Sequence, residues 1–146
     1  MESPSLSRVL IANRGEIAVR LIRAVREAGL EAVAVHPADD RDSLHVRRAD
    51  AAVPVPGEGV AAYLDAAAIA RAARQSGCGA VHPGYGFLSE NADFAQLCAD
   101  AGLVFIGPTP ETLRVMGDKA QARAFAAAHK VAVLPGTSGP TTLEEA

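Results

Sequence analysis

The loop from residue 82 to residue 91, HPGYGFLSEN, combines glycine with polar side chains in a way that suits ligand binding. Its two glycines permit positive φ angles and close approach of the backbone to a bound molecule. Tyr85 and Glu90 are polar loop residues of the kind that often face a ligand. Phe87 and Leu88 are expected to pack onto the core. We therefore predict that this loop forms a wall of a binding site, with a tight turn as the purely structural alternative.

Lys119 is conspicuous because it is one of only two lysines, the other being Lys130, in a chain with 14 basic residues. The sequence predicts that it lies in the first turn of a helix capped by Asp118. A cation in that position opposes the helix dipole. A phosphate or another anionic ligand would explain its presence there, whereas a solvated lysine is the alternative.

The segment NRGE, residues 13–16, follows the first predicted strand, where doubly wound sheets place phosphate groups. It has a single glycine, Gly15, whereas the dinucleotide fingerprint needs three and an acid after the second strand. His36 and Pro37 stand where that acid would be, so an NAD site is disfavoured. Arg14 and Glu16 are expected to pair with each other or to brace a neighbouring loop.

Three charged residues, Arg20, Arg23 and Glu27, share one face of the helix predicted after this segment. Their spacing allows an ion pair between Arg23 and Glu27, worth only a few tenths of a kcal/mol if solvated. A solvated face is one interpretation. A subunit contact is the other, because arginine is favoured at interfaces.

The composition excludes several classes of function. The chain has 146 residues, 49% of them hydrophobic, which is enough for one domain with a buried core. Its net charge is −3 and it has no block of like charge, which argues against a nucleic-acid partner. Its histidines and two cysteines show no metal-ligand spacing, so no metal site is assigned and the cysteines are expected to be buried thiols. We find neither a signal-peptide pattern nor a run of the ~18 apolar residues needed to span a membrane. A cytoplasmic protein is predicted, with no membrane partner.

Short apolar runs alternate with helical patterns along most of the chain, which predicts the elements that position these residues. The first strand and the second are separated by one helix of about thirteen residues, an arrangement typical of a right-handed crossover and parallel strands. Pro54 restricts the third strand to an edge of the sheet. We therefore predict an α/β fold with a doubly wound, mostly parallel Rossmann-like sheet. The expected strands are residues 8–12, 31–35, 49–55, 79–82 and 103–107.

The pattern changes at Gly117, which predicts a domain boundary. A helix is expected from Asp118 to about His129, then a strand over residues 131–135. Thr142 and Glu145 have the spacing of a capping box, which would open another helix just before the last residue. We expect residues 1–117 to form one domain and residues 118–146 to begin a second, truncated domain, so that the chain is a piece of a longer protein.

Four stretches of this sequence together resemble the N-terminal region of biotin carboxylases, the ATP-dependent components of acetyl-CoA, propionyl-CoA, methylcrotonyl-CoA and pyruvate carboxylases. The resemblance covers essentially the whole chain, in order and at the expected spacing. The four stretches are residues 9–27, 82–95, 105–123 and 134–140.

The resemblance implies a fold and a set of roles. It implies a pre-ATP-grasp domain followed by the start of an ATP-grasp domain. Lys119 matches the lysine that contacts ATP phosphates in the family. Tyr85 and Gly86 match the loop that lies near biotin and bicarbonate. Arg20, Arg23 and Glu27 match a helix that many bacterial members use in a homodimer interface.

The resemblance also implies a reaction that needs more than this chain. Such enzymes use ATP, Mg²⁺ and bicarbonate to carboxylate biotin on a carrier protein, and a carboxyltransferase passes the carboxyl group to an acyl-CoA. Their lid over ATP, metal-binding glutamates and catalytic arginine would follow residue 146. We therefore expect no catalytic residue and no carboxylase activity in this chain alone, and no cofactor bound tightly.

Two alternatives stay open at this stage. The chain could be the N-terminal part of a pyruvate or urea carboxylase, because these share the same N-terminal motifs. It could also be a stand-alone, non-catalytic interaction module that docks on full-length subunits. The final carboxyl acceptor does not follow from these residues.

Overall fold

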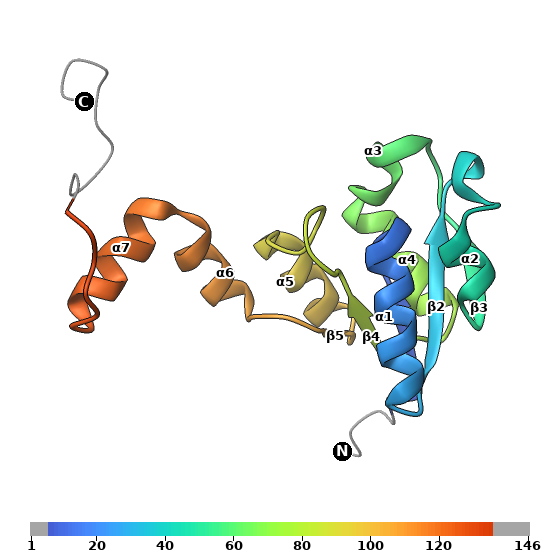
Figure 1. Cartoon of the computed structure of the whole chain (residues 1–146), viewed down its shortest axis with the longest axis horizontal. Coiled ribbons are helices and arrows are strands. Elements are labelled where there is room, and N and C mark those ends of the chain that lie inside the picture. The colour runs from blue at the N-terminus through green and yellow to red at the C-terminus, as the bar shows by residue number, and fades with distance from the viewer. Residues whose placement is uncertain (1–5, 136–146) are drawn as a thin grey trace.

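The computed structural model describes residues 6–135 and contains a five-stranded, wholly parallel sheet with the strand order β3-β2-β1-β4-β5 (Figure 1). The predicted doubly wound α/β fold is therefore confirmed. Pro54 lies in an edge strand, as predicted, where its missing N–H costs no ladder hydrogen bond. The strands are β1 (Arg8–Ile11), β2 (Glu31–His36), β3 (Ala51–Pro54), β4 (Ala80–His82) and β5 (Val104–Phe105).

Helices cover both faces of the sheet and bury two hydrophobic cores. On one face, α1 packs Leu21, Ile22 and Val25 against residues of β1, β2 and β4. On the other face, α4 and α5 bury a larger core that includes Ile69 and Phe94. The helices are α1 (Gly15–Glu27), α2 (Leu44–Arg48), α3 (Gly59–Tyr63), α4 (Ala66–Gln75), α5 (Ala92–Asp100), α6 (Pro110–Gly117), α7 (Lys119–Ala128) and the 3-10 turn η1 (Ala38–Asp40).

Side-chain caps explain where several helices begin. Asn91 accepts a hydrogen bond from the backbone N–H of Phe94 at the start of α5, and Asp65 does the same for Ala68 at the start of α4. Thr109 caps α6, whose first residue is Pro110. Asparagine, aspartate and threonine are residue types that N-cap positions prefer. Both cysteines are buried free thiols, as expected.

Some elements differ from the prediction. The short elements η1, α2 and α3 were not predicted, because three to five residues are too few to show a helical period. The strand predicted over residues 131–135 is wrong: these residues are exposed and form no regular structure. A strand needs a partner strand to satisfy its backbone, and within the described part of the chain none lies beside it. The capping box at Thr142 and Glu145 lies outside the described residues.

The last two helices extend away from the sheet (Figure 1). In α6, Leu113 is buried. In α7, none of the residues is buried, although Asp118 caps the helix by accepting a hydrogen bond from the N–H of Gln121. No helix among residues 6–135 is long and apolar enough to cross a membrane.

Candidate functional site

The candidate site lies at the carboxyl edge of the sheet, between β1 and β4. These strands are neighbours, but from β1 the chain proceeds to β2 and β3 on one side, whereas β4 is followed by β5 on the other. The direction of the strand order thus reverses between β1 and β4, which is called a topological switch point. The loops that follow the two strands diverge there, and open α/β sheets bind ligands between them. Here those loops are residues 12–14 and residues 83–91. They contain the first half of the motif at residues 13–16 and all of the motif at residues 82–91 except His82.

Asn13 connects the two loops. Its side chain is fully buried, and its amide Nδ2 donates to the backbone oxygens of Pro83, at 2.7 Å, and Tyr85, at 3.0 Å. Its Oδ1 accepts from the backbone N–H of Arg14 at 2.9 Å. The polar atoms of this buried side chain are therefore used to hold backbone. Asn13 was not among the predicted site residues.

Gly84 makes close contact with Asn13 and helix α1. A Cβ atom at Gly84 would lie 2.8 Å from the Nδ2 of Asn13 and 2.8 Å from a methyl carbon of Ile17. The residue also has φ +70°, which favours glycine. The glycines of this loop were predicted to let the backbone approach a bound molecule, whereas the close neighbours of Gly84 are side chains of the protein itself.

His82, at the end of β4, supports the same turn. Its Nδ1 accepts a hydrogen bond from the N–H of Gly84 at 3.0 Å, so the ring carries its proton on Nε2 when neutral. Burial, and to a lesser extent the charge of Arg20, lowers the pKa of His82. Both effects favour the neutral ring that can accept from Gly84.

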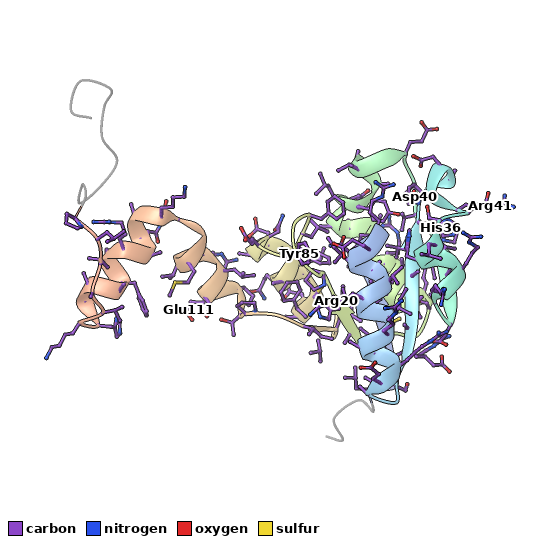
Figure 2. All side chains as sticks on the ribbon, viewed as in Figure 1. Arg20, His36, Asp40, Arg41, Tyr85 and Glu111 are labelled. Carbon is purple, nitrogen blue, oxygen red and sulfur yellow. The ribbon has the colours of Figure 1, made fainter. Side chains whose placement is uncertain are left out.

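Arg14 and Glu16 do not pair with each other; each braces a different loop, which was one of the two expected outcomes. The guanidinium of Arg14 donates to both oxygens of Asp40, Nε at 2.6 Å and Nη2 at 2.8 Å. The Glu16 Oε1 accepts a hydrogen bond from the Tyr85 hydroxyl at 2.7 Å. Figure 2 shows Tyr85 and Asp40 flanking the N-terminal end of α1.

Asp40 is the centre of a buried polar network that sequence analysis did not find. Besides Arg14, it accepts hydrogen bonds from the Tyr63 hydroxyl at 2.8 Å and the Ser43 hydroxyl at 2.9 Å. The hydrogen bonds from Arg14 hold the pKa of the Asp40 carboxyl well below its usual range, against the opposing effect of burial. Burial, followed by the hydrogen bond to Asp40, raises the pKa of Tyr63. Asp40 is thus a stable carboxylate.

Phe87 attaches the loop of residues 83–91 to this network. Its ring stacks on that of Tyr63, with centroids 5.6 Å apart and planes 10° from parallel. Leu88 is 2% exposed. The prediction that these two residues pack onto the core is confirmed. Phe87 has φ +44°, which is uncommon for a residue with a side chain, so its stacking offsets a backbone conformation that is otherwise disfavoured.

Tyr85 is an exposed residue of the loop, with 56% of its surface accessible. The hydrogen bond to Glu16 raises the pKa of its hydroxyl, so the hydroxyl is neutral and serves as the donor. Tyr85 and Gly86 line a pocket of about 330 Å³ together with Asn13, Arg14, Ile17 and Phe87. This pocket combines an aromatic side chain with glycine backbone and suits a small ligand that has both apolar and polar parts.

Lys119 lies elsewhere. It lines a second pocket, of about 460 Å³, with Ser89, Glu90 and residues of α6. The loop of residues 83–91 therefore contributes to both pockets, but the structure does not bring Lys119 into the pocket of Tyr85 and Gly86. Lys119 is exposed and forms no salt bridge within residues 6–135.

The charged face of α1 is also separate from the Tyr85 pocket. Arg20 and Arg23 line a depression of about 540 Å³ with Glu16 and Leu44. Glu27 is exposed on the same helix but does not line this depression, and Arg23 and Glu27 form no salt bridge in the described part of the chain. The interface assigned to these residues stays a prediction. Among residues 6–135, no three His, Cys, Asp or Glu side chains gather as a metal site would require.

Comparisons with known proteins point to one family. The family model described as biotin carboxylase, N-terminal domain, matches residues 5–113. Mitochondrial pyruvate carboxylase of Rattus norvegicus is 51% identical over 100% of this chain and 13% of its own length. The biotin-dependent acyl-coenzyme A carboxylase alpha3 subunit of Mycobacterium leprae is 52% identical over 94% of this chain and 23% of its own length.

A bacterial biotin carboxylase and a solved structure are similar to this chain as well. The biotin carboxylase of Allochromatium vinosum is 52% identical over 94% of this chain and 31% of its own length. The structure of the biotin carboxylase domain of a single-chain bacterial carboxylase is 62% identical, with a TM-score of 0.89, over 95% of this chain and 32% of that chain. The chain therefore spans less than a third of the length of each of these relatives.

Proposed function

The chain belongs to the biotin carboxylase N-terminal domain family, and we propose that it works as the N-terminal region of a larger biotin-dependent carboxylase. In this role it contributes to the ATP-dependent carboxylation of biotin on a carrier protein. One observation carries the proposal: the loop of residues 83–91, at the switch point of the sheet, lines a pocket beside Tyr85 on one side and a pocket beside Lys119 on the other.

We assign biotin and bicarbonate to the neighbourhood of Tyr85 and Gly86. The pocket there offers glycine backbone and an aromatic wall, which suit a small, partly apolar, partly polar molecule. The residues around it are held in place by Asn13 and by the Asp40 network. Because Arg14 is already paired with Asp40, its charge is largely compensated, and we give it a supporting role and not the role of an anion ligand.

We assign the phosphates of ATP to Lys119. Its ammonium group is exposed at the start of α7, without an ion pair among the described residues, and the nearby Ser89 can donate a hydrogen bond. A lysine in this setting suits phosphate binding. No three His, Cys, Asp or Glu side chains gather among the described residues, and we assign the ligands of Mg²⁺ to other parts of the larger protein. When bound, Mg²⁺ would supply charge neutralisation for phosphoryl transfer.

We propose a domain boundary at Gly117, with residues 1–117 as the N-terminal domain and residues 118–146 as the beginning of an ATP-grasp domain. Support comes from burial: buried hydrophobic residues continue along the chain as far as Leu113 in α6, whereas α7 buries none of its residues. A domain is a unit with its own hydrophobic core, and α7 does not share in this one.

The partners that follow are a biotin carboxyl carrier, a carboxyltransferase and, through the face of Arg20, Arg23 and Glu27, a second copy of the subunit. We propose an acyl-CoA as the final carboxyl acceptor and the cytoplasm as the compartment. A pyruvate carboxylase remains the second candidate, because a mitochondrial pyruvate carboxylase is as similar to this chain, at 51% identity, as an acyl-CoA carboxylase subunit, at 52%.

A chimera tests the proposal. Residues 1–146 replace the matching segment of the biotin carboxylase of Allochromatium vinosum, and ATP hydrolysis is measured with and without free biotin. We expect biotin-stimulated hydrolysis. Lys119→Gln should raise the KM for ATP by about tenfold, the value of one charged hydrogen bond of about 1.4 kcal/mol.

Lys130→Gln is the matched control, because Lys130 lies just past the opposite end of α7. It should leave the KM for ATP within about twofold of the unsubstituted chimera. A folded chimera without biotin-stimulated hydrolysis would contradict the proposed function. Equal effects of the two substitutions would contradict the role of Lys119 alone.

A further inference from the structure

We propose that Asn13 is a positioning residue, whose buried amide fixes the backbone of residues 83–85 and thereby sets the orientation of Tyr85 and Gly86 in the pocket. The kinetic part of this inference rests on the proposed function. The structural part does not, because it concerns a contact between two loops of this chain.

The hydrogen bonds of Asn13 divide into two groups with different consequences. Its Nδ2 donates to two backbone oxygens in the other loop, those of Pro83 and Tyr85, on either side of Gly84. Its Oδ1 accepts from the N–H of the adjacent Arg14 and so shapes only its own loop. Of the two groups of Asn13, only the donor therefore connects the loop after β1 to the loop after β4.

The position of Asn13 leaves the loop little freedom. The side chain is fully buried, and the Cα of Gly84 is packed so closely that a Cβ would lie 2.8 Å from Nδ2. A buried carbonyl without a donor is costly. Without Nδ2, the carbonyl oxygens of Pro83 and Tyr85 would have to move to find other donors.

The substitution Asn13→Asp separates these functions. An aspartate has nearly the same shape and can still accept from the N–H of Arg14, but when ionised it has no donor. The aspartate would place a carboxylate oxygen where Nδ2 now lies, facing the carbonyl oxygens of Pro83 and Tyr85. The expected result is a displaced loop with the Arg14 contact retained, which a general loss of folding would not produce.

The first experiment measures order in the 146-residue chain by heteronuclear NMR relaxation. In Asn13→Asp, the backbone order parameters of Tyr85 and Gly86 should fall from about 0.85 to below about 0.6, while those of β1 and of Arg14 stay unchanged. Unchanged order at Tyr85 and Gly86 together with unchanged amide shifts would overturn the proposal.

The second experiment uses the chimera described above. In Asn13→Asp, kcat/KM for biotin should fall by at least about tenfold, because small displacements of positioned groups have effects of this size. The KM for ATP should change by less than about twofold, because Lys119 lies in a different pocket. Parallel losses for biotin and ATP would overturn the positioning role in favour of a general structural one.

Two controls keep the outcomes distinct. Asp65→Ala removes the cap of α4, away from the loop, and should reduce stability without a selective effect on biotin. If Asn13→Asp does not fold, Asn13→Ala, whose side chain also lacks a donor, is measured in both experiments with the same expected results for Tyr85, Gly86 and biotin. If the unsubstituted chimera is inactive, the proposed function fails while the NMR experiment still decides whether Asn13 holds the loop.

Discussion

The carboxylate of Asp40 shows how much of the site depends on one residue. It receives hydrogen bonds from Arg14, Tyr63 and Ser43, and Tyr63 in turn stacks on Phe87 of the loop. Through these contacts a side chain that follows β2 helps to fix a loop that follows β4. An exposed residue could not do this, because water would compete for each of its hydrogen bonds.

Asp40→Asn should lower the free energy of unfolding by about 1–3 kcal/mol, since it removes the charge that Arg14 and Tyr63 face. The lower part of this range is expected because the Arg14 side chain is 44% exposed and can regain water. Urea unfolding followed by circular dichroism gives the value. Asp42→Asn, at an exposed position of the same segment, is the control, and an equal loss in both variants would contradict the network.

His45 makes stability depend on pH. It is 1% exposed, and its Nε2 lies 3.3 Å from the backbone oxygen of Val35. Its Nδ1 has no hydrogen-bond partner among residues 6–135. Burial lowers the pKa of His45. Below about pH 6.5 the unfolded chain therefore binds a proton that the folded chain binds less readily, and stability falls as pH falls.

We expect the unfolding free energy to decrease from about pH 7 to about pH 5, a window set by histidine and above that of the carboxylates. The pKa of His82 is also lowered, so His82 adds to the dependence of the unfolding free energy on pH. His45→Gln should make the unfolding free energy depend less steeply on pH. His129→Gln, at an exposed position, should leave that dependence unchanged. Identical slopes in the two variants would show that His45 does not carry the effect.

Residue types and spacing were sufficient to predict the roles of some residues but not others. The capping residues Asn91 and Thr109 could be predicted because each bonds to an N–H three positions away. Asn13 and Asp40 could not, because their partners lie far along the chain: Tyr85 is 72 positions from Asn13, and Tyr63 is 23 positions from Asp40. Only the folded sheet brings these groups together.

At the scale of elements, α7 differs from the helices that cover the sheet. It has a side-chain cap at Asp118 but buries none of its residues, whereas α5 has a cap at Asn91 and buries Phe94, Ala95 and Cys98. Because helices are stabilised mainly by tertiary packing, the two caps should have different consequences for the molecule.

Asp118→Ala should weaken α7 by about 1 kcal/mol without lowering the melting temperature of the sheet. Asn91→Ala should weaken α5 by a similar free energy. It should also lower the melting temperature by several degrees, because α5 packs its side chains into the core. Hydrogen exchange of peptides from α7 and from β1, together with thermal unfolding, distinguishes the two. A comparable fall in melting temperature for both variants would contradict the independence of α7.

The prediction of elements succeeded where a segment carries its own pattern. The strands and longer helices have apolar periods and caps that can be recognised locally. The five-residue helices α2 and α3 are too short for such a period. Residues 131–135 are apolar enough for a strand but are exposed, because a strand also needs a neighbour to pair with.

At the scale of the whole molecule, the topology explains why the site is where it is. The strand order places β1 beside β4, so the loops carrying Asn13 and Tyr85 meet at the switch point. The alternation of strands and helices predicted the parallel sheet, and the resemblance of four motifs predicted the family. The final carboxyl acceptor could not be predicted, because relatives with different acceptors share this region equally well.

The most direct test of the central claim is the transfer of label from radioactive bicarbonate to free biotin by the chimera with the Allochromatium vinosum enzyme. We predict ATP-dependent formation of labelled carboxybiotin by the chimera, and none by the 146-residue chain alone. A folded chimera that binds ATP but transfers no label to biotin would contradict the assignment of this chain to the biotin-carboxylating site.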